Sequence, residues 1–175
     1  DPLKYFDTKQ AKRLDRFSQF AIIAAREAFT DSGITEENTD FERVGIYVGS
    51  GIGGFDTIQN QCRTNYEKGN GRVSPMFIPM GICNMPAGNI AIDLGLKGES
   101  LAIVTACATS THSIGEAYRN IKHGYQDVIL AGGSEAAVCQ TSVAGFENMK
   151  ALSSATDKNR ASIPFDKERN GFVMG

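Results

Sequence analysis

Cys107 is the residue of this 175-residue chain whose position best suits covalent chemistry. It follows the apolar run 101-LAIVT-105 and comes just before a stretch with helical periodicity. A thiol at the start of a helix faces the positive end of the helix dipole and unpaired amide N–H groups, and both favour the thiolate. Small residues flank it and leave space for an acyl group: Thr105, Ala106, Ala108, Thr109 and Ser110. We interpret Cys107 as a nucleophile on a sharp strand-to-helix turn.

The other three cysteines, Cys62, Cys83 and Cys139, are expected to be inert buried thiols. No two cysteines form a C-x-x-C pair, and no Cys/His cluster has zinc-ligand spacing. The sequence therefore predicts free thiols in a reducing compartment and no metal site.

A cysteine nucleophile needs a proton partner, and the chain has two histidines. His112 follows Cys107 by five residues, so on a helix it points about 140° away from the cysteine. His123 closes the same helix, far from its start. We expect His112 to be a packing residue and His123 a helix-end cation, so the nucleophile lacks its acid and base partners here.

The stretch 49-GSGIGG-54 matches the G-x-G-x-x-G pattern of dinucleotide-binding folds. Such a site also needs a following strand that ends in an acidic residue about 20 positions on. Residues 55–75 instead have the pattern of one polar helix and a loop rich in glycine and asparagine. We reject the dinucleotide interpretation and expect these glycines to let the backbone pass close to another group at the end of a strand.

Three continuous apolar runs, 44–48, 101–105 and 128–132, predict parallel strands that helices cover on both faces. Between the last two runs, a helical stripe of Ile114, Ala117, Tyr118 and Ile121 predicts a βαβ unit. A capping box at Asp7 and Gln10 predicts one long helix that ends at Gly33, and residues 86–94 predict a shorter helix. The fold class is α/β, in one layered domain.

Composition excludes several classes of protein. With 18 basic and 20 acidic residues the net charge is −2, which does not suit a nucleic-acid binder. No apolar run is long enough for a membrane span, and no secretory signal is visible.

Three basic residues, Lys9, Lys12 and Arg13, place positive charges on one face at a helix start. Positive charges at this end oppose the helix dipole, and a solvated surface is the plain interpretation. The chain starts at Asp1 and stops within 171-GFVMG-175, which we interpret as a fragment.

Four motifs in order resemble the β-ketoacyl-[acyl-carrier-protein] synthases of the thiolase-like fold, type II most of all. They are 104-VTACATSTHSIGEA-117, 131-AGGSEAA-137, 143-VAGFENMKALS-153 and 164-PFDKERNGFVMG-175. The stretches 49–54 and 73–92 also have counterparts, so the resemblance covers essentially the whole chain. It implies a layered α/β/α/β/α fold in a dimeric enzyme. Residues 1–175 would be part of the amino-terminal ketoacyl-synthase domain, without its first strand and without the carboxyl-terminal half.

The resemblance also implies roles for individual residues. Cys107 would accept the acyl chain from acyl carrier protein as a thioester, with its own N–H as one oxyanion donor. Ile52 and Phe146 would line the acyl pocket, and Phe77 would reach the pocket across a homodimer interface. A docking surface for the acidic carrier would comprise Lys9, Lys12, Arg13, Arg72 and Lys150. We expect no cofactor and no metal.

Some expected parts are missing or altered. The two catalytic histidines, a nearby lysine and the second oxyanion donor of the family belong to the carboxyl-terminal half, so these 175 residues alone should be inactive. Cys83 stands where relatives often have proline or valine, and Ser110 where glycine is frequent. Both are small changes that should leave the pocket intact.

The sequence thus predicts a β-ketoacyl synthase that loads an acyl group on Cys107 and condenses it with malonyl carrier protein during fatty-acid elongation. A polyketide ketosynthase domain and a non-catalytic carrier-binding or dimerisation module are the alternatives. A cysteine hydrolase fits least well, because nothing positions a base for water. We expect the protein in a bacterial cytoplasm or in an organelle's matrix or stroma, without nucleic-acid or membrane partners.

Overall fold

A computed structural model describes residues 1–175 and contains one parallel sheet of three strands in the order β2-β1-β3. The strands are β1 (Val44–Gly49), β2 (Ser100–Leu101) and β3 (Val128–Gly133). β1 is buried along its whole length, as its continuously apolar sequence predicts. It pairs with β3 from Val44 opposite Val128 to Gly49 opposite Gly133. β1 and β3 therefore end together at one edge of the sheet.

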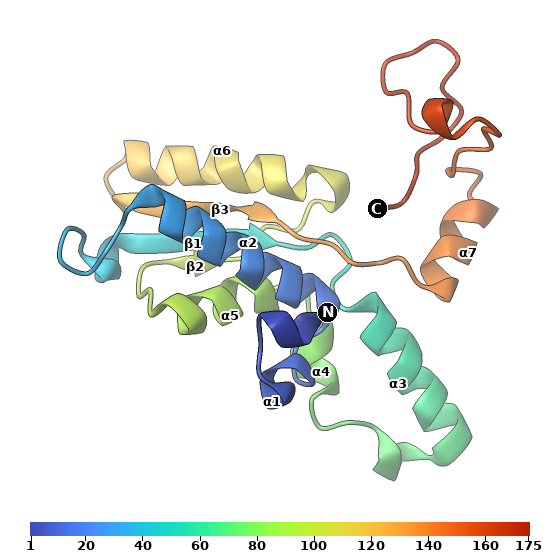
Figure 1. Cartoon of the computed structure of the whole chain (residues 1–175), viewed down its shortest axis with the longest axis horizontal. Helices are drawn as coiled ribbons and strands as arrows, with labels where there is room; N and C mark the ends of the chain where they lie inside the picture. Colours follow the sequence, from blue (N-terminus) through green and yellow to red (C-terminus); the bar gives the residue numbers. More distant parts are fainter.

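Helices cover both faces of this sheet (Figure 1). Helix α6 (Thr109–Lys122) packs on one face, and α2 (Arg16–Ser32) and α5 (Met85–Leu94) pack on the other. The main apolar core lies between β1 and this helix pair; its buried members are Phe6, Ala21, Ile22, Ala25, Val44, Ile46, Val48, Ala87, Ile90 and Leu96. The α/β class, the βαβ unit and the helix over 86–94 are confirmed.

The prediction of one long amino-terminal helix is wrong. The predicted capping box is present, since the Asp7 carboxylate accepts hydrogen bonds from the Lys9 and Gln10 N–H groups at 2.8 Å each. However, α1 (Thr8–Ala11) ends after one turn and α2 begins at Arg16. The cause is Asp15, a second N-cap, which accepts from the Phe17 N–H and the Thr57 hydroxyl. Gly33 ends α2 in the left-handed conformation, as expected.

The second strand is much shorter than predicted. Only Ser100 and Leu101 pair with β1, and the chain then leaves the sheet toward the turn that carries Cys107. Leu101 and Val104 are exposed, so this run is not covered on both faces as expected.

Helix α6 turns an unexpected face to the sheet. Its buried residues are the small side chains Thr109, Ser113 and Ala117, which recur every four positions. Of the predicted apolar stripe only Ala117 is buried, whereas Ile114 and Tyr118 are 56% and 63% exposed. The small side chains let α6 lie close to the sheet and direct the large apolar ones away from it.

The remaining elements lie mostly beyond the carboxyl ends of the strands (Figure 1). They are α3 (Phe55–Lys68), α4 (Phe77–Gly81), α7 (Gln140–Asn148) and the single-turn 3₁₀ helices η1 (Pro2–Lys4), η2 (Phe41–Arg43), η3 (Asn70–Arg72), η4 (Ala106–Ala108) and η5 (Lys158–Arg160). The polar helix and the glycine-rich loop expected after Gly54 are confirmed as α3 and the turn after it. None of the helices has both the length and the apolar character that a membrane span requires.

Candidate functional site

Cys107 lies in the turn η4, directly before α6, with an exposed side chain. The residue before it, Ala106, has a φ of 53°, in the left-handed region that residues with a side chain rarely adopt. Two hydrogen bonds hold the turn: the Thr105 N–H donates to Thr109 Oγ1 at 2.9 Å, and the Ala108 N–H donates to the Thr105 carbonyl at 3.1 Å. The cysteine therefore projects from a sharp, constrained turn at a helix start, as the sequence predicts.

Two glycines let this turn lie against the end of the sheet. A Cβ atom on Gly49 would come within 2.0 Å of the Ile103 carbonyl oxygen, and one on Gly51 would lie 3.3 Å from Ala106 Cα. Any side chain at Gly49 would push the cysteine turn outward. The close backbone approach expected of the glycine stretch is thus confirmed. Gly49 and Gly51 lie against the chain that leads into Cys107, and Gly53 and Gly54 lie against the end of α4.

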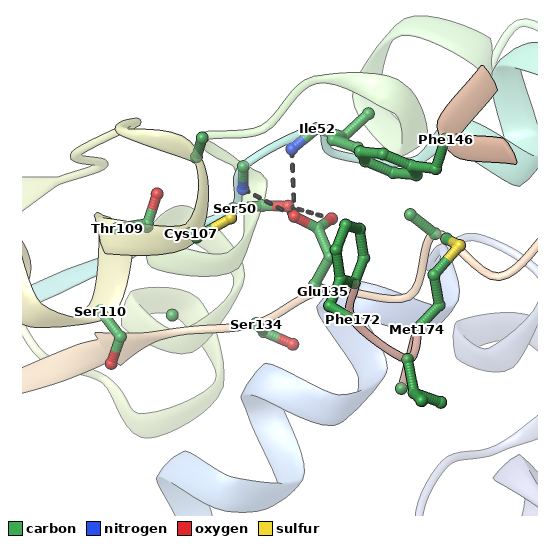
Figure 2. A pocket seen from close by; sticks show the side chains of 16 residues that line it. Ser50, Ile52, Cys107, Thr109, Ser110, Ser134, Glu135, Phe146, Phe172 and Met174 are labelled. Atoms are coloured by element: carbon green, nitrogen blue, oxygen red, sulfur yellow. Dashed lines mark hydrogen bonds between the residues drawn. The ribbon is translucent and has the colours of Figure 1, made fainter. Parts of the chain in front are cut away.

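Cys107 opens onto a cavity of about 520 Å³ at the carboxyl edge of the sheet (Figure 2). One part of the wall is polar and comes from the strand ends and α6: Ser50, Thr109, Ser110, Ser134 and Glu135. The opposite part is apolar: Ile52, Phe146, Phe172, Val173 and Met174. Phe146 and Phe172 meet edge to face with their ring centres 5.2 Å apart. A thiol at one side and an apolar wall at the other suit a thioester with a hydrocarbon tail.

The expected pocket residues divide into two groups. Ile52 and Phe146 line the cavity together with Cys107. Phe77 does not; it begins α4 as a partly buried residue outside the cavity wall.

Sequence reasoning missed Glu135, which lies in the loop after β3. Its Oε2 atom accepts hydrogen bonds from the N–H groups of Gly51 at 2.9 Å and Ile52 at 3.1 Å, and its Oε1 atom accepts from the Ser50 hydroxyl at 2.9 Å. The glycine stretch therefore binds a carboxylate of its own chain. The helix after it, α3, does not lead directly into a second strand, as a dinucleotide-binding fold requires. An acidic residue just after a predicted strand, in 131-AGGSEAA-137, was the available signal.

The end of the chain was also missed as a wall of the cavity. Phe172 forms a short parallel bridge with Leu152: its N–H donates to the Ala151 carbonyl at 3.0 Å, and its carbonyl accepts from the Ser153 N–H at 2.9 Å. This bridge brings residues 172–175 to the cavity. The pairing joins two irregular segments with no strand periodicity, so sequence periodicity could not reveal it.

Neither histidine lines the cavity. His112 is exposed, so its expected packing role is wrong; its Nδ1 atom lies 2.7 Å from the Thr105 hydroxyl oxygen. His123 is exposed at the end of α6, the position that the sequence predicted. No group of histidine, cysteine or acidic side chains is arranged to hold a metal ion.

The other thiols are less buried than expected. All four cysteines are free, as predicted. Cys62 is exposed on α3, which contradicts its expected burial, while Cys83 and Cys139 are partly buried. None of these three lines the cavity. All five basic residues of the expected docking surface are exposed: Lys9, Lys12, Arg13, Arg72 and Lys150.

Comparison with known proteins gives a consistent result. The family model described as the β-ketoacyl synthase N-terminal domain matches residues 2–175. The chain is 46% identical over 171 residues to 3-oxoacyl-[acyl-carrier-protein] synthase 2 of Staphylococcus aureus (strain N315), which covers 98% of this chain and 41% of that protein. It is 43% identical over 176 residues to the protein of the same name from a Synechocystis species, with 100% of this chain and 42% of that protein covered.

A solved structure is similar as well. It is a type II polyketide synthase ketosynthase bound to a hexaketide, in complex with its acyl-carrier protein. The TM-score is 0.80 at 25% identity, over 87% of this chain and 45% of the other. This likeness confirms the thiolase-like layered α/β fold. The chain spans about two fifths of the length of the curated relatives it matches.

Proposed function

The chain belongs to the β-ketoacyl synthase family, and from that membership we propose that it supplies the nucleophile and the acyl pocket of a 3-oxoacyl-[acyl-carrier-protein] synthase of fatty-acid elongation. The observation that carries this proposal is the position of Cys107, on a constrained turn at a helix start and at the wall of a cavity with an apolar side. The names of the two curated relatives support it.

In the first proposed step, the Cys107 thiolate attacks the carbonyl carbon of an acyl group that is held as a thioester on acyl carrier protein. The new carbon–sulfur bond forms, the old one breaks, and the carrier's thiol leaves as a thiolate that takes up a proton. The Cys107 N–H is our candidate for one oxyanion donor, and losing such a donor typically costs about 2.7–4 kcal/mol. The acyl tail would lie along Ile52, Phe146 and Phe172.

In the second step, malonyl carrier protein loses carbon dioxide, and the carbanion that remains attacks the Cys107 thioester. A carbon–carbon bond forms and the Cys107 thiolate is released. Neither histidine of this chain lines the cavity, so the groups that promote decarboxylation must come from elsewhere in the full-length protein. Residues 1–175 are, in this proposal, part of the amino-terminal domain and inactive alone.

The proposed partners are acyl carrier protein and a second copy of the same subunit. The carrier would dock on the five exposed basic residues, and the similar ketosynthase bound to an acyl-carrier protein supports a partner of this kind. Phe77 would then act in the cavity of the other subunit, which agrees with its place outside its own. Four free thiols suit a reducing compartment such as a bacterial cytoplasm or an organelle's matrix or stroma.

A polyketide ketosynthase is the second candidate, and the structural likeness to a type II polyketide ketosynthase favours it. Both candidate functions begin with acylation of Cys107, and they differ in the chemistry of the acyl chain that is extended. Fatty-acid elongation extends an acyl chain whose keto groups have been reduced, whereas a polyketide synthase extends a chain that still carries keto groups. The higher identity to the 3-oxoacyl-[acyl-carrier-protein] synthases ranks elongation first.

The test is acyl transfer and condensation by the full-length protein. We expect incubation with dodecanoyl carrier protein to add one acyl group, which mass spectrometry maps to Cys107, and malonyl carrier protein then to release a 3-oxoacyl product. A Cys107→Ala variant should take up no acyl group, whereas Cys62→Ala, which removes the exposed thiol of α3, should behave as the parent. Acylation of a Cys107→Ala variant, or none of the parent, would refute the proposal.

A further inference from the structure

Glu135 is the acidic side chain in the cavity wall, and it forms none of the ion pairs of the chain. Its charge is met instead by three donors from the loop after β1: the N–H groups of Gly51 and Ile52 and the hydroxyl of Ser50. Hydrogen bonds to a charged acceptor are roughly twice as strong as neutral ones. Figure 2 shows the carboxylate directed at this loop, with Cys107 and Phe172 on either side of it.

The contact extends along the loop through Ser50. The Ser50 side chain is buried, and its oxygen accepts a hydrogen bond from the Gly53 N–H at 2.9 Å while its proton goes to Glu135. Glu135 and Ser50 together therefore fix the backbone from residue 50 to residue 53. The fit is close, because a Cβ atom on Gly51 would lie 2.8 Å from Glu135 Oε2.

The loop that Glu135 holds carries Ile52, a member of the apolar wall. We propose that Glu135 is a positioning residue for acyl-chain selectivity: by binding the Gly51 and Ile52 N–H groups, it keeps the Ile52 side chain at a fixed place in the cavity. This inference rests on the proposed function. Without the carboxylate, two amides lose their acceptor and the Ile52 wall can shift, so chains of different length are distinguished less well.

Two substitutions of Glu135 separate the effect of side-chain length from the effect of charge. Glu135→Asp keeps the charge but withdraws the carboxylate by one methylene, so it cannot reach both amides. Glu135→Gln keeps the reach without the charge: its carbonyl can accept from Gly51 and Ile52, and its NH₂ group can donate to Ser50 Oγ. A positioning role predicts that glutamine preserves function better than aspartate.

The experiment measures kcat and KM of the full-length protein with dodecanoyl and hexanoyl carrier protein. We expect Glu135→Asp to bring the ratio of the two kcat/KM values closer to one by about tenfold, the effect of a small misfit in an apolar pocket, with the larger part in KM. Glu135→Gln should keep the ratio of the parent. Glu27→Asp, a control at an exposed position on α2, should leave it unchanged as well.

An unchanged ratio in Glu135→Asp would overturn the inference, and so would a glutamine variant that loses as much as the aspartate variant, which would indicate a role for charge. If Glu135→Asp fails to fold by circular dichroism, Ser50→Ala replaces it. This variant removes the acceptor of the Gly53 N–H and should also bring the ratio of the two kcat/KM values closer to one; an unchanged ratio would overturn the inference equally. A parent protein that neither carrier acylates at Cys107 would contradict the proposed function instead.

Discussion

At the scale of single residues, Tyr47 shows how one side chain joins three elements. Its hydroxyl on β1 donates to the carboxylate of Glu99, just before β2, and accepts from the Asn120 side chain of α6 at 2.6 Å. Asn120 also donates to Glu99 at 2.9 Å. Burial of the ring, and secondarily the hydrogen bond to Glu99, raises the pKa of Tyr47 well above its ordinary 10.0.

This raised pKa predicts how stability depends on pH. Folding favours the neutral phenol, so the contribution of Tyr47 is complete below about pH 10 and declines above it, as the unfolded chain ionises and the folded chain does not. Tyr47→Phe removes two hydrogen bonds, one to Glu99 and one from Asn120, while the bond between Asn120 and Glu99 can remain. At a net value of about 0.5–1.5 kcal/mol for each bond, the variant should lose about 1–3 kcal/mol at neutral pH.

The measurement is the difference in Tm between the full-length parent and the Tyr47→Phe variant. The Tm difference should be largest at about pH 8 and should decrease toward about pH 11. Other tyrosines and lysines titrate in both proteins, so the difference isolates Tyr47. A gap that widens with alkaline pH would contradict this account.

Part of the site could be predicted residue by residue. Cys107 was found from its place between a strand and a helix, and the resemblance to a family led to Ile52 and Phe146, which line the cavity. Glu135 and Phe172 were not found, because their roles depend on contacts with segments far away in the sequence. Hydrophobic periodicity in a sequence predicts local helices and strands, and it does not reveal contacts between distant segments.

At the scale of elements, most strongly patterned segments were predicted to within one residue, and the exceptions are the long first helix and the second strand. β1 and α5 appear where their apolar runs and the closing glycine place them. The long first helix breaks because Asp15 caps a new helix and binds Thr57 of α3, and the second of these contacts is tertiary. Asp15 was not predicted as an N-cap, because the apolar periodicity continues across it.

The buried face of helix α6 also differs from its apolar stripe. This stripe was the pattern that predicted the helix, yet the small residues Thr109, Ser113 and Ala117 are the ones that are buried. Ile114, Tyr118 and Ile121 remain exposed in this chain. The helix thus packs small side chains on the sheet and leaves a row of large apolar side chains uncovered, and contiguous exposed apolar surface often marks a contact with another part of a protein.

At the scale of the whole molecule, that exposed face agrees with a chain that spans about two fifths of its relatives' length. The three layers seen here would be part of the five layers that the resemblance implies. We propose that the remaining part of the full-length protein covers α6 and the edge at β2.

Carrier docking also belongs to this scale, because it concerns charges spread over several elements. Lys12→Glu in the full-length protein should raise KM for acyl carrier protein about fivefold with little change in kcat, since complementary charge mainly assists encounter. Adding Arg13→Glu should raise KM further, and added salt should reduce both effects. The control is Lys97→Glu, an exposed cation that precedes β2, away from the cavity edge. Unchanged KM in the double variant would remove Lys12 and Arg13 from the docking surface.

The central claim is that the turn before α6 presents Cys107 to a cavity that accepts an apolar tail. The most direct test compares alkylation of Cys107 and Cys62 in the full-length protein by iodoacetamide and by its N-dodecyl derivative, with mass spectrometry of the two peptides. Both thiols are exposed, so access alone predicts equal rates. We predict faster alkylation of Cys107 by the small reagent, and a further gain of at least about tenfold from the dodecyl tail at Cys107 only. Equal rates at the two cysteines, or no gain from the tail at Cys107, would contradict the claim.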